Sequence, residues 1–226
     1  MIQNRKVIAL VPIKEHSERV TNKNFRSFGG KPLYHHIIQI LEHTYAVDNI
    51  IINTDSFVVK NEAIQLFSKV IIHDRPNELI GDFISVNTLI ESDLNRSEAD
   101  IYIQTHATNP LLKAETIASA LNRFVEEENG YDSLFSVNKF QSRFYDKDGN
   151  PVNHNPNELL RTQDLPPLYE ENSCLYIFTK ESFAKRKTRI GEKPILYTIP
   201  NIEAVDIDDE YTFKLAEIIA LYSKEG

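Results

Sequence analysis

Basic and polar side chains gather directly behind an apolar run near the start of the chain. The β-branched run Val7–Val11 predicts a buried strand that stops at Pro12, and an irregular polar segment follows before a helix pattern begins near Pro32. The polar segment contains Lys14, Ser17, Arg19, Lys23 and Asn24. Cations beside a hydroxyl suit a triphosphate, because Arg can fork onto two phosphate oxygens while Lys acts as a movable point charge.

The position of this segment favours a ligand site, although its composition also fits a solvated basic loop. The carboxyl end of the first strand of an open α/β sheet is a usual place for ligands to bind. Neither GxGxxG nor GxxxxGK[ST] occurs, so the common glycine-rich phosphate loops are absent from the sequence. Gly29-Gly30 is instead predicted to turn the chain into the helix at Pro32.

Two aspartates near the other end of the chain form a second candidate site. In a strand, Asp206 and Asp208 would share one face, and two carboxylates at that spacing suit Mg²⁺ bridging a nucleotide phosphate. Alternatively, Asp208 or Asp209 caps the helix that follows, since acids are favourable at a helix start. Both can hold, with Asp209 and Glu210 serving the helix. We expect the aspartates and the basic segment to meet across one crevice.

The elements that must position these residues alternate along the chain. Short apolar runs predict strands, and apolar residues at helical spacing predict helices. Besides the first strand, the predicted strands are 50–52, 70–72, 101–103, 133–137, 174–178 and 195–199, and the predicted helices are 33–41, 62–67, 114–127 and 213–221. This alternation with short connections predicts an α/β fold, a mostly parallel Rossmann-like wound sheet flanked by helices.

Composition limits the partners and the cellular compartment. The formal charge of 25 minus 33, or −8, makes non-specific nucleic-acid binding improbable for this chain of 226 residues. The single cysteine, Cys174, lies in an apolar run and allows no internal disulfide, which fits a reducing cytoplasm. No apolar run approaches the roughly 18 residues of a spanning helix, and the chain starts with a strand pattern and not a signal peptide. We therefore expect a cytoplasmic protein with no membrane partner.

The first loop resembles a known family. PIKEHSERVTNKN followed by GKPL is similar to the first motif of the CMP-acylneuraminate and CMP-Kdo synthetases, cytidylyltransferases that activate acidic sugars. The resemblance implies that CTP is bound by Pro12, Lys14, Ser17, Arg19, Lys23 and Asn24. It further implies catalytic roles for Lys14, Arg19 and Lys23. The family more often has Arg at the position of Lys14, and Lys keeps the charge but loses the bidentate geometry.

Two later motifs extend the resemblance on the nucleotide side. RPNEL at 75–79 matches a family segment whose arginine contacts the nucleotide, although Arg75 could equally be a salt-bridged loop residue. Asp82 and Ser85 stand where the family begins a helix that closes on the base. VDID followed by further acids is a recurrent family ending, which implies that Asp206 and Asp208 hold Mg²⁺ and that Asp208 is catalytic.

Candidate residues for the second substrate follow from two other segments. In QTHATNPL, Thr108 to Leu111 matches the family's TSPL, so either Gln104 or His106 takes the family's glutamine contact to the sugar. The stretch from Arg161 to Asn172 is similar to an acceptor-pocket motif, which suggests Arg161 for the sugar carboxylate and Gln163 and Asn172 for hydroxyl or amide contacts. The alternative is that LPP is a rigid connector and Asn172 a turn residue.

The region 139–167 breaks the alternating pattern. Asp148-Gly149 between Tyr145 and Pro151 predicts a hairpin turn. In the resembled family the equivalent insertion is a β-arm through which two subunits pair, and a long irregular segment needs such a reason. We expect one domain over 1–226 with 139–167 as a dimerisation arm, and a homodimer.

These motifs together imply an enzyme that joins CMP from CTP to the anomeric hydroxyl of a 2-keto acidic sugar and releases pyrophosphate. Other readings remain open. A related nucleotidyltransferase would use a phosphonate or a sugar phosphate. A glycosyltransferase of similar fold would use a nucleotide sugar, although its acidic motif usually lies mid-chain. A non-catalytic module would bind CTP without turnover.

Overall fold

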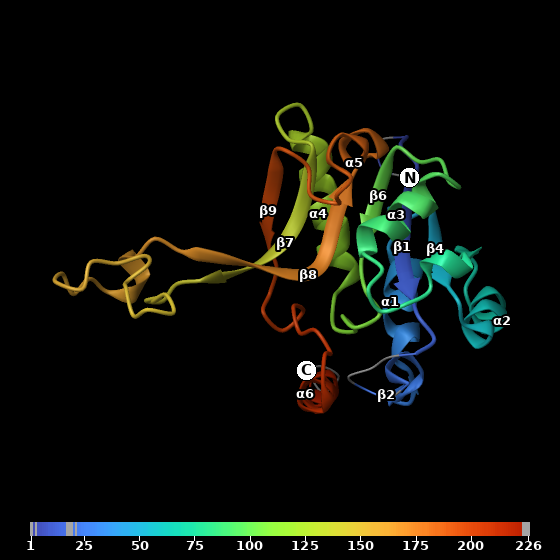
Figure 1. The fold of residues 1–226 in the computed structure, drawn as a ribbon, viewed down its shortest axis with the longest axis horizontal. Helices are drawn as coiled ribbons and strands as arrows, with labels where there is room; N and C mark the ends of the chain where they lie inside the picture. The colour runs from blue at the N-terminus through green and yellow to red at the C-terminus, as the bar shows by residue number, and fades with distance from the viewer. Residues whose placement is uncertain (1, 3, 17–19, 21, 223–226) are drawn as a thin grey trace.

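The architecture is a twisted sheet between two layers of helices, with an arm that leaves the body (Figure 1). The structure, a computed structural model, describes residues 2, 4–16, 20 and 22–222. Within these residues seven strands form one sheet in the order β5-β4-β1-β6-β8-β7-β9, and two form a short hairpin. The predicted α/β fold with a mostly parallel wound sheet is therefore confirmed.

The strands and helices have the following bounds. The strands are β1 (Val7–Ile13), β2 (Ser27–Phe28), β3 (Lys31–Pro32), β4 (Asn49–Thr54), β5 (Val70–Asp74), β6 (Ile101–Gln104), β7 (Ser133–Phe140), β8 (Leu168–Phe178) and β9 (Pro194–Thr198). The α-helices are α1 (Leu33–His43), α2 (Phe57–Leu66), α3 (Val86–Leu94), α4 (Ala114–Glu127), α5 (Lys180–Arg186) and α6 (Glu210–Tyr222). Short 3-10 helices span η1 (Lys23–Phe25), η2 (Asn77–Leu79) and η3 (Thr162–Asp164).

Parallel pairing brings the ends of four strands to one edge of the sheet. β1 pairs in parallel with β4 and β6, and β4 pairs in parallel with β5. β8 runs antiparallel to both of its neighbours, β6 and β7. The residues that follow β1, β4, β5 and β6 therefore meet at one edge, where the polar segments of the sequence lie.

Helices on both faces explain why the central strands are apolar throughout. Every residue of β1 is buried except the half-buried Pro12, as in parallel strands covered on both sides. One core cluster joins α1, α2 and α4 to one face of the sheet, and a second joins α3 and α5 to the other face. The sheet that carries the polar segments is thus packed on both faces.

The last helix closes against the first loop. Gly29 and Gly30, with φ of 57° and 94°, make the turn between β2 and β3 that leads into α1, as expected. Phe28 packs edge-on against Phe213 of α6, and the Arg26 guanidinium lies 4.0 Å from the centre of the Phe213 ring. Segments from opposite ends of the sequence are therefore neighbours.

The predicted helix at 62–67 is wrong in its start. α2 begins at Phe57, after Ser56, whose hydroxyl accepts a hydrogen bond from the Val59 N–H at 3.5 Å. Phe57 and Val58 are exposed, so the first turn carries no amphipathic pattern that would predict it. The other helices predicted from spacing correspond to α1, α4 and α6, the helix that the resemblance implies near Asp82 and Ser85 is α3, and α5 was not predicted.

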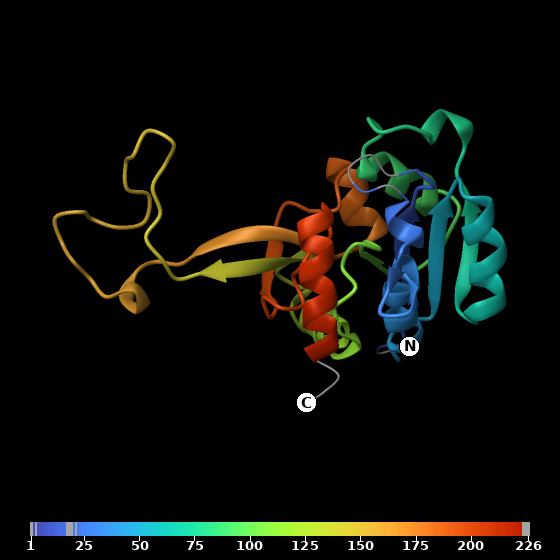
Figure 2. The same ribbon diagram turned by 90° about the horizontal axis from the view of Figure 1, so that it is seen from below.

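The arm consists of the outer ends of β7 and β8 and the loop 141–167 between them (Figures 1 and 2). The predicted turn at Asp148-Gly149 is present, with Tyr145 bridged to Pro151 and Gly149 at φ 84°. The mostly buried Asn153 holds the loop together, because its side chain accepts from the Phe144 N–H and donates to two backbone carbonyls.

No helix in the described part of the chain has the length and apolar character needed to cross a membrane.

Candidate active site

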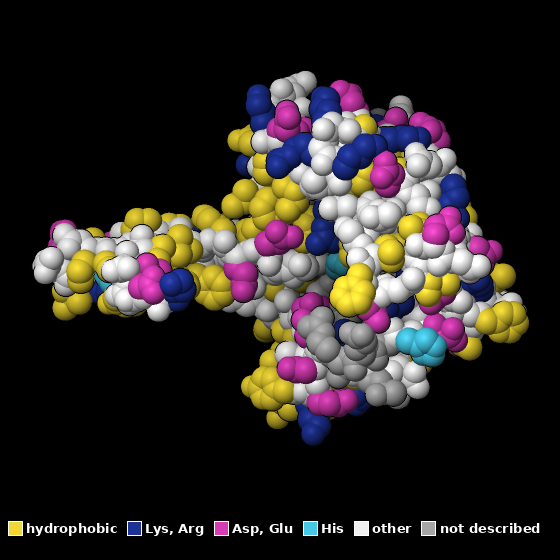
Figure 3. Space-filling view, in the orientation of Figure 1, with side chains coloured by type: hydrophobic (Ala, Val, Ile, Leu, Met, Phe, Trp, Pro, Cys, Tyr) yellow, Lys and Arg dark blue, Asp and Glu magenta, His cyan; other side chains and the backbone are white. Residues whose placement is uncertain are grey.

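A cavity of about 270 Å³ opens at the carboxyl edge of the parallel strands. It lies at the end of β1, whose neighbours in the sheet are β4 on one side and β6 on the other. The strand order reverses direction at this point, which is the usual ligand position in open α/β sheets. In Figure 3 basic side chains and a histidine lie in a recess in the middle of the body. The lining residues are Pro12, Lys14, Lys23, Asn24, Arg75, Leu79, Gly81, Asp82, Ile84, Val86, Leu89, His106, Ala107 and Thr108. Six of the predicted nucleotide-binding residues are among them.

Lys14 reaches the cavity from the end of β1. Its ammonium forms an ion pair with the carboxylate of Asp82, and both side chains are about 40% exposed. The buried Asn24 donates from its side-chain amide to the Lys14 carbonyl at 3.0 Å, which fixes the backbone of the loop. The cation is therefore held at the cavity by a partner that solvent also reaches.

Lys23 joins the first loop to the acidic segment. Its ammonium donates to the Ile207 carbonyl at 2.6 Å and lies 3.9 Å from Asp208 Oδ1. The two parts of the sequence that were expected to meet across one crevice are thus in contact through Lys23.

The acidic segment is not the strand that the sequence predicts. Residues 205–208 are irregular, and the Ile207 N–H donates to the Thr108 carbonyl at 2.9 Å instead of to a neighbouring strand. Ile207 is buried, while Asp206 and Asp208 on either side of it are half-buried. The two carboxylates still flank one anchored residue, Ile207, although no strand holds them.

The predicted helix cap is Asp209, the residue after Asp208. Asp209 Oδ1 accepts from the Thr212 N–H at 2.7 Å at the start of α6, as an N-cap does. Glu210 forms an ion pair with Arg26 of the first loop. Asp209 thus caps the helix and Glu210 lies in its first turn, as expected.

The donor set near Asp206 and Asp208 is compatible with Mg²⁺. Asp206 Oδ1 lies 3.5 Å from the Asn109 amide, and Asp208 lies beside Lys23. The described residues contain no group of three or more His, Cys, Asp or Glu side chains arranged around a common metal position. Mg²⁺ needs no such cage, since it usually takes one or two carboxylates together with substrate phosphates and water.

Arg75 lines the cavity and is also ion-paired, as the salt-bridge alternative expects, and its contact with the nucleotide stays a prediction. It is buried, and its guanidinium donates to the side-chain oxygen and the carbonyl of Asn53 at 2.9 and 2.8 Å. Asp55 lies 3.9 Å away. Burial lowers the pKa of Arg75, while Asp55 and Asp93 act in the opposite direction.

Behind Arg75 a buried network fixes its orientation. Asn53 donates from its amide to Asp93 Oδ1 of α3 at 2.8 Å, and the same oxygen contacts His73 Nδ1 at 2.8 Å. Asn53 and Asp93 are buried almost completely. Arg75 is therefore tied through Asn53 to the helix that covers the cavity.

Ser85 serves as the N-cap of α3. Its hydroxyl accepts from the Asn87 N–H at 3.2 Å, while its neighbours Ile84 and Val86 line the cavity. A direct nucleotide contact of Ser85 stays a prediction. Ser17 and Arg19 lie outside the described residues.

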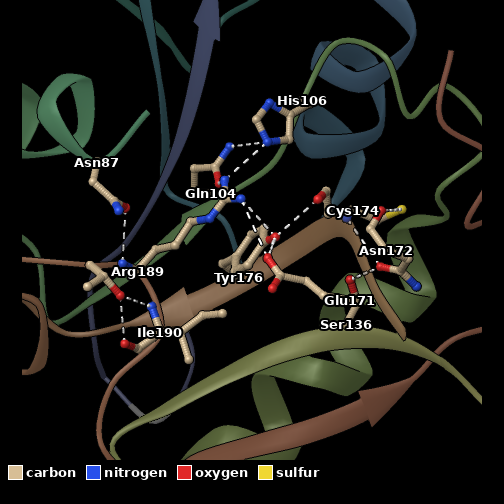
Figure 4. Close-up of polar contacts among 12 residues, drawn as sticks. Asn87, Gln104, His106, Ser136, Glu171, Asn172, Cys174, Tyr176, Arg189 and Ile190 are labelled. Atoms are coloured by element: carbon tan, nitrogen blue, oxygen red, sulfur yellow. Dashed lines mark hydrogen bonds and ion pairs between the residues drawn. The ribbon is translucent and has the colours of Figure 1, made fainter. Parts of the chain in front are cut away.

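On the side of β6 the cavity is bounded by His106 and the residues behind it (Figure 4). The fully buried Gln104 donates from its amide to His106 Nε2 at 3.1 Å, and the Arg189 guanidinium reaches both side chains. The two alternatives for the sugar contact are therefore one hydrogen-bonded unit, with His106 at the cavity wall and Gln104 behind it.

Arg189 and Tyr176 were not predicted as site residues. Arg189 lies between α5 and β9 and donates from Nη2 to the Tyr176 hydroxyl at 2.8 Å, with its guanidinium 3.6 Å from the centre of the Tyr176 ring. The segment around Arg189 has no motif in the sequence. Tyr176 could have been found from the sequence, because it ends a YxxN…Y pattern that begins at Tyr169. Arg189 could be found only from its tertiary contacts.

Three predicted acceptor residues do not reach this cavity. Asn172 is buried in β8 and binds Ser136, Asn138 and the Cys174 N–H beside a bulge, so it is a strand residue and not the turn residue of the alternative prediction. Arg161 and Gln163 lie on the arm, where Arg161 pairs with Asp164 at 2.7 Å. The physical reason is that the chain leaves the body between β7 and β8, which carries this motif away from the sheet edge.

The fold and the cavity together define a nucleotide-binding α/β protein with a cationic loop and an acidic segment at one sheet edge. The family model described as cytidylyltransferase matches residues 8–225, and the chain belongs to this family.

Curated relatives are similar over most of the chain. A CMP-N,N'-diacetyllegionaminic acid synthase of Legionella pneumophila is 26% identical and covers 98% of this chain and 99% of its own. A pseudaminic acid cytidylyltransferase of Campylobacter jejuni is 23% identical, with 98% and 99% covered. An N-acylneuraminate cytidylyltransferase B of Danio rerio is 28% identical, with 92% of this chain and 50% of its own covered.

Solved structures confirm the fold. The CMP:2-keto-3-deoxy-manno-octonic acid synthetase complexed with CTP superposes with a TM-score of 0.68 at 14% identity, over 98% of this chain and all of that chain. The 4-diphosphocytidyl-2C-methyl-D-erythritol synthase of Anaerococcus prevotii gives 0.66 at 10% identity, with 96% of each chain covered.

Proposed function

We propose that this protein transfers CMP from CTP to the anomeric hydroxyl of a 2-keto acidic sugar. The observation that carries the proposal is the contact of Lys23, which lines the cavity, with Ile207 and Asp208 of the acidic segment, in a member of the cytidylyltransferase family. Relatives named for legionaminic, pseudaminic and acylneuraminic acids support an acidic nine-carbon sugar as the acceptor class.

In this reaction the anomeric oxygen attacks the α-phosphorus of CTP, the bond from that phosphorus to the β-phosphate oxygen breaks, and pyrophosphate leaves. Lys14, Arg19, Lys23 and Arg75 would neutralise the phosphates, with Pro12, Ser17 and Asn24 shaping the loop around the nucleotide. Catalysis would come mainly from positioning and charge stabilisation. Asp82 would act as the counter-ion that Lys14 exchanges for a phosphate oxygen.

We further propose that Asp206 and Asp208 hold Mg²⁺ when CTP is bound. Carboxylate oxygens are suitable ligands for this ion, and two of them leave positions for phosphate oxygens and water. The metal would supply additional positive charge at the phosphates. Asp208 lies closest to Lys23, so we assign it the larger share of the effect.

The proposal is tested by measuring pyrophosphate release from CTP and Mg²⁺ with N-acetylneuraminic, N,N'-diacetyllegionaminic and pseudaminic acids and Kdo. We expect release with at least one of these acids and none without acceptor. Release with a phosphonate or a sugar phosphate alone would assign a different acceptor class. CTP binding without release in every mixture would show a non-catalytic nucleotide-binding module.

We propose that the arm, residues 139–167, pairs two subunits of a cytoplasmic homodimer. It projects from the body and exposes Phe140, Tyr145 and Leu159, among other apolar side chains, which favours a protein partner. Phe140 pairs directly with Leu168, so replacing 141–167 by Asn-Gly would close β7 and β8 as a hairpin. Sedimentation should then show a monomer, and an unchanged dimer would contradict the role of the arm.

A further inference from the structure

A buried guanidinium stands behind the cavity wall on the acceptor side, and the nucleotide chemistry does not use it. Arg189 Nη1 donates to Gln104 Oε1 at 2.5 Å and lies 3.2 Å from His106 Nε2, while Nη2 donates to the Tyr176 hydroxyl (Figure 4). Its side chain is only 17% exposed. The three contacted side chains come from β6, the loop after β6 and β8, so Arg189 sits where these segments converge.

The hydrogen-bond acceptors of this guanidinium are neutral. An amide oxygen, a phenol and an imidazole take its N–H groups, and burial raises the pKa of Tyr176 so that the phenol stays protonated. Glu171 accepts a hydrogen bond from Tyr176, and its carboxylate lies 3.8 Å from Arg189 Nη2, beyond hydrogen-bond distance. Glu171 is therefore an ion-pair partner of Arg189 that makes no direct hydrogen bond to it, and the hydrogen bonds of the guanidinium go to neutral acceptors.

His106 lies between Arg189 and the cavity, and its imidazole is uncharged. Its Nε2 faces two donors, the Gln104 amide and the Arg189 guanidinium, so that nitrogen must be unprotonated. Burial and the nearby cations Arg189 and Lys23 lower the pKa of His106 to about 3, which agrees with a neutral ring. An anion at this wall therefore meets an uncharged imidazole, with Arg189 and Lys23 as the cations near it.

We propose that Arg189 binds the carboxylate of the acceptor acid and thereby selects 2-keto acids over neutral sugars. The inference rests on the proposed function and deepens it. A carboxylate can replace a neutral acceptor on the guanidinium with shorter, charge-assisted hydrogen bonds. In a 2-keto acid the carboxylate is attached to the anomeric carbon, so holding it also orients the attacking hydroxyl. Gln104 and Tyr176 hold the Arg189 guanidinium in place through their hydrogen bonds to it.

A purely structural role is the competing explanation. The Arg189 N–H donates to Asn87 Oδ1 of α3 at 3.3 Å, and the side chain joins β6 to β8, so Arg189 could simply brace the segment before β9. A brace and a carboxylate ligand differ in one measurable respect. Loss of a brace lowers activity with every acceptor, whereas loss of the ligand lowers activity only with acceptors that carry the carboxylate.

The test compares the best acid of the panel with its C1 amide, in wild type and in Arg189→Gln. We expect wild type to favour the acid in kcat/KM by about 10- to 100-fold, the usual range for one charged hydrogen-bonding pair. Arg189→Gln should lose most of this preference, with the KM for CTP within about twofold. Arg186→Gln is the matched control, because Arg186 donates to the Gly191 carbonyl and braces the same segment; it should keep the preference.

Each other outcome has a defined meaning. An acid preference that survives in Arg189→Gln, an equal loss for acid and amide, or a wild type that does not distinguish the two would overturn the inference. Wild type that turns over no acid would instead overturn the proposed function. If thermal unfolding shows that Arg189→Gln does not fold, Arg189→Lys replaces it, since it keeps the charge without the fork and should retain only part of the preference.

Discussion

The cations on two walls of the cavity, the proposed nucleotide wall around the β1 loop and the proposed acceptor wall around His106, are held in different ways. On the nucleotide wall Lys14 pairs directly with the partly exposed Asp82, and Lys23 and Arg75 lie 3.9 Å from Asp208 and Asp55. On the acceptor wall the Arg189 guanidinium donates to an amide and a phenol and contacts an imidazole, while the Glu171 carboxylate, 3.8 Å from Arg189, accepts its hydrogen bond from Tyr176.

The difference indicates how each wall responds to its ligand. A cation paired with a partly exposed carboxylate can exchange that partner for a phosphate at little net cost, since such pairs contribute little to stability. Buried neutral acceptors hold Arg189 in one orientation, and its ion pair with Glu171 involves no direct hydrogen bond that a ligand would have to break. On the nucleotide wall we therefore expect the largest effects on activity from substitutions that remove a charge. On the acceptor wall we expect them from substitutions that change how a side chain is oriented.

The largest effect should come from Asp208→Asn. Removing the negative charge beside Lys23 should lower turnover by about 100-fold or more, because the proposed metal site loses a charged ligand. Pyrophosphate production at saturating Mg²⁺ measures this. Asp209→Asn is the matched control: it alters the cap of α6 and should cost about 1 kcal/mol of stability or less with near-normal turnover. Wild-type activity in Asp208→Asn would break the assignment.

A smaller effect is expected where the nucleotide wall depends on geometry. Asn53→Ala removes the acceptor of Arg75 and the donor to Asp93, so Arg75 loses its fixed orientation. We expect the KM for CTP to rise about 10-fold, together with a stability loss of about 1–3 kcal/mol. Asn61→Ala, on the exposed surface of α2, is the control. An unchanged KM in a destabilised Asn53→Ala would show that the network serves stability alone.

On the acceptor wall, His106 should make stability depend on pH. Its pKa is about 3 in the folded protein and near 6.5 in an unfolded chain. Between these values the unfolded chain binds more protons, so stability is present above about pH 6.5 and is lost as pH falls toward 3, by up to about 1.4 kcal/mol per pH unit. Urea unfolding of His106→Gln between pH 4.5 and 7 should show a shallower loss. The exposed His43→Gln should follow wild type, and a His106→Gln curve parallel to wild type would contradict the neutral ring.

The smallest effect has the opposite sign. Asp82→Asn removes the carboxylate that Lys14 must leave when it binds a phosphate. CTP should bind about two- to fivefold more tightly, as expected for an exposed pair. Calorimetric titration measures this, and weaker binding would show that Asp82 itself contacts the nucleotide.

The sequence predicted which residues meet at the proposed nucleotide wall, because they lie at or just beyond the ends of apolar strands. Pro12 and Lys14 follow from the end of β1, and Arg75 from the end of β5. Parallel strands bring such residues to one edge whatever the details of packing, so the position was readable from periodicity. The resemblance to a family then narrowed the ligand.

The acceptor wall was less predictable because it depends on contacts between distant segments. Arg189 meets Gln104 across 85 positions, and no local pattern marks it. Arg161 has the better motif, yet the arm carries it away from the body. Asp206 and Asp208 were placed in a strand because their alternation fits one, but Ile207 finds its hydrogen-bond partner in a loop.

The bond from Lys23 to the Ile207 carbonyl has a consequence for biosynthesis. These residues are 184 positions apart, so at about 5–20 residues per second the ribosome adds the second roughly 10–40 seconds after the first. The parallel strands next to β1 have all emerged during that interval. The protein therefore becomes competent for chemistry only at the end of translation, after its scaffold has been made.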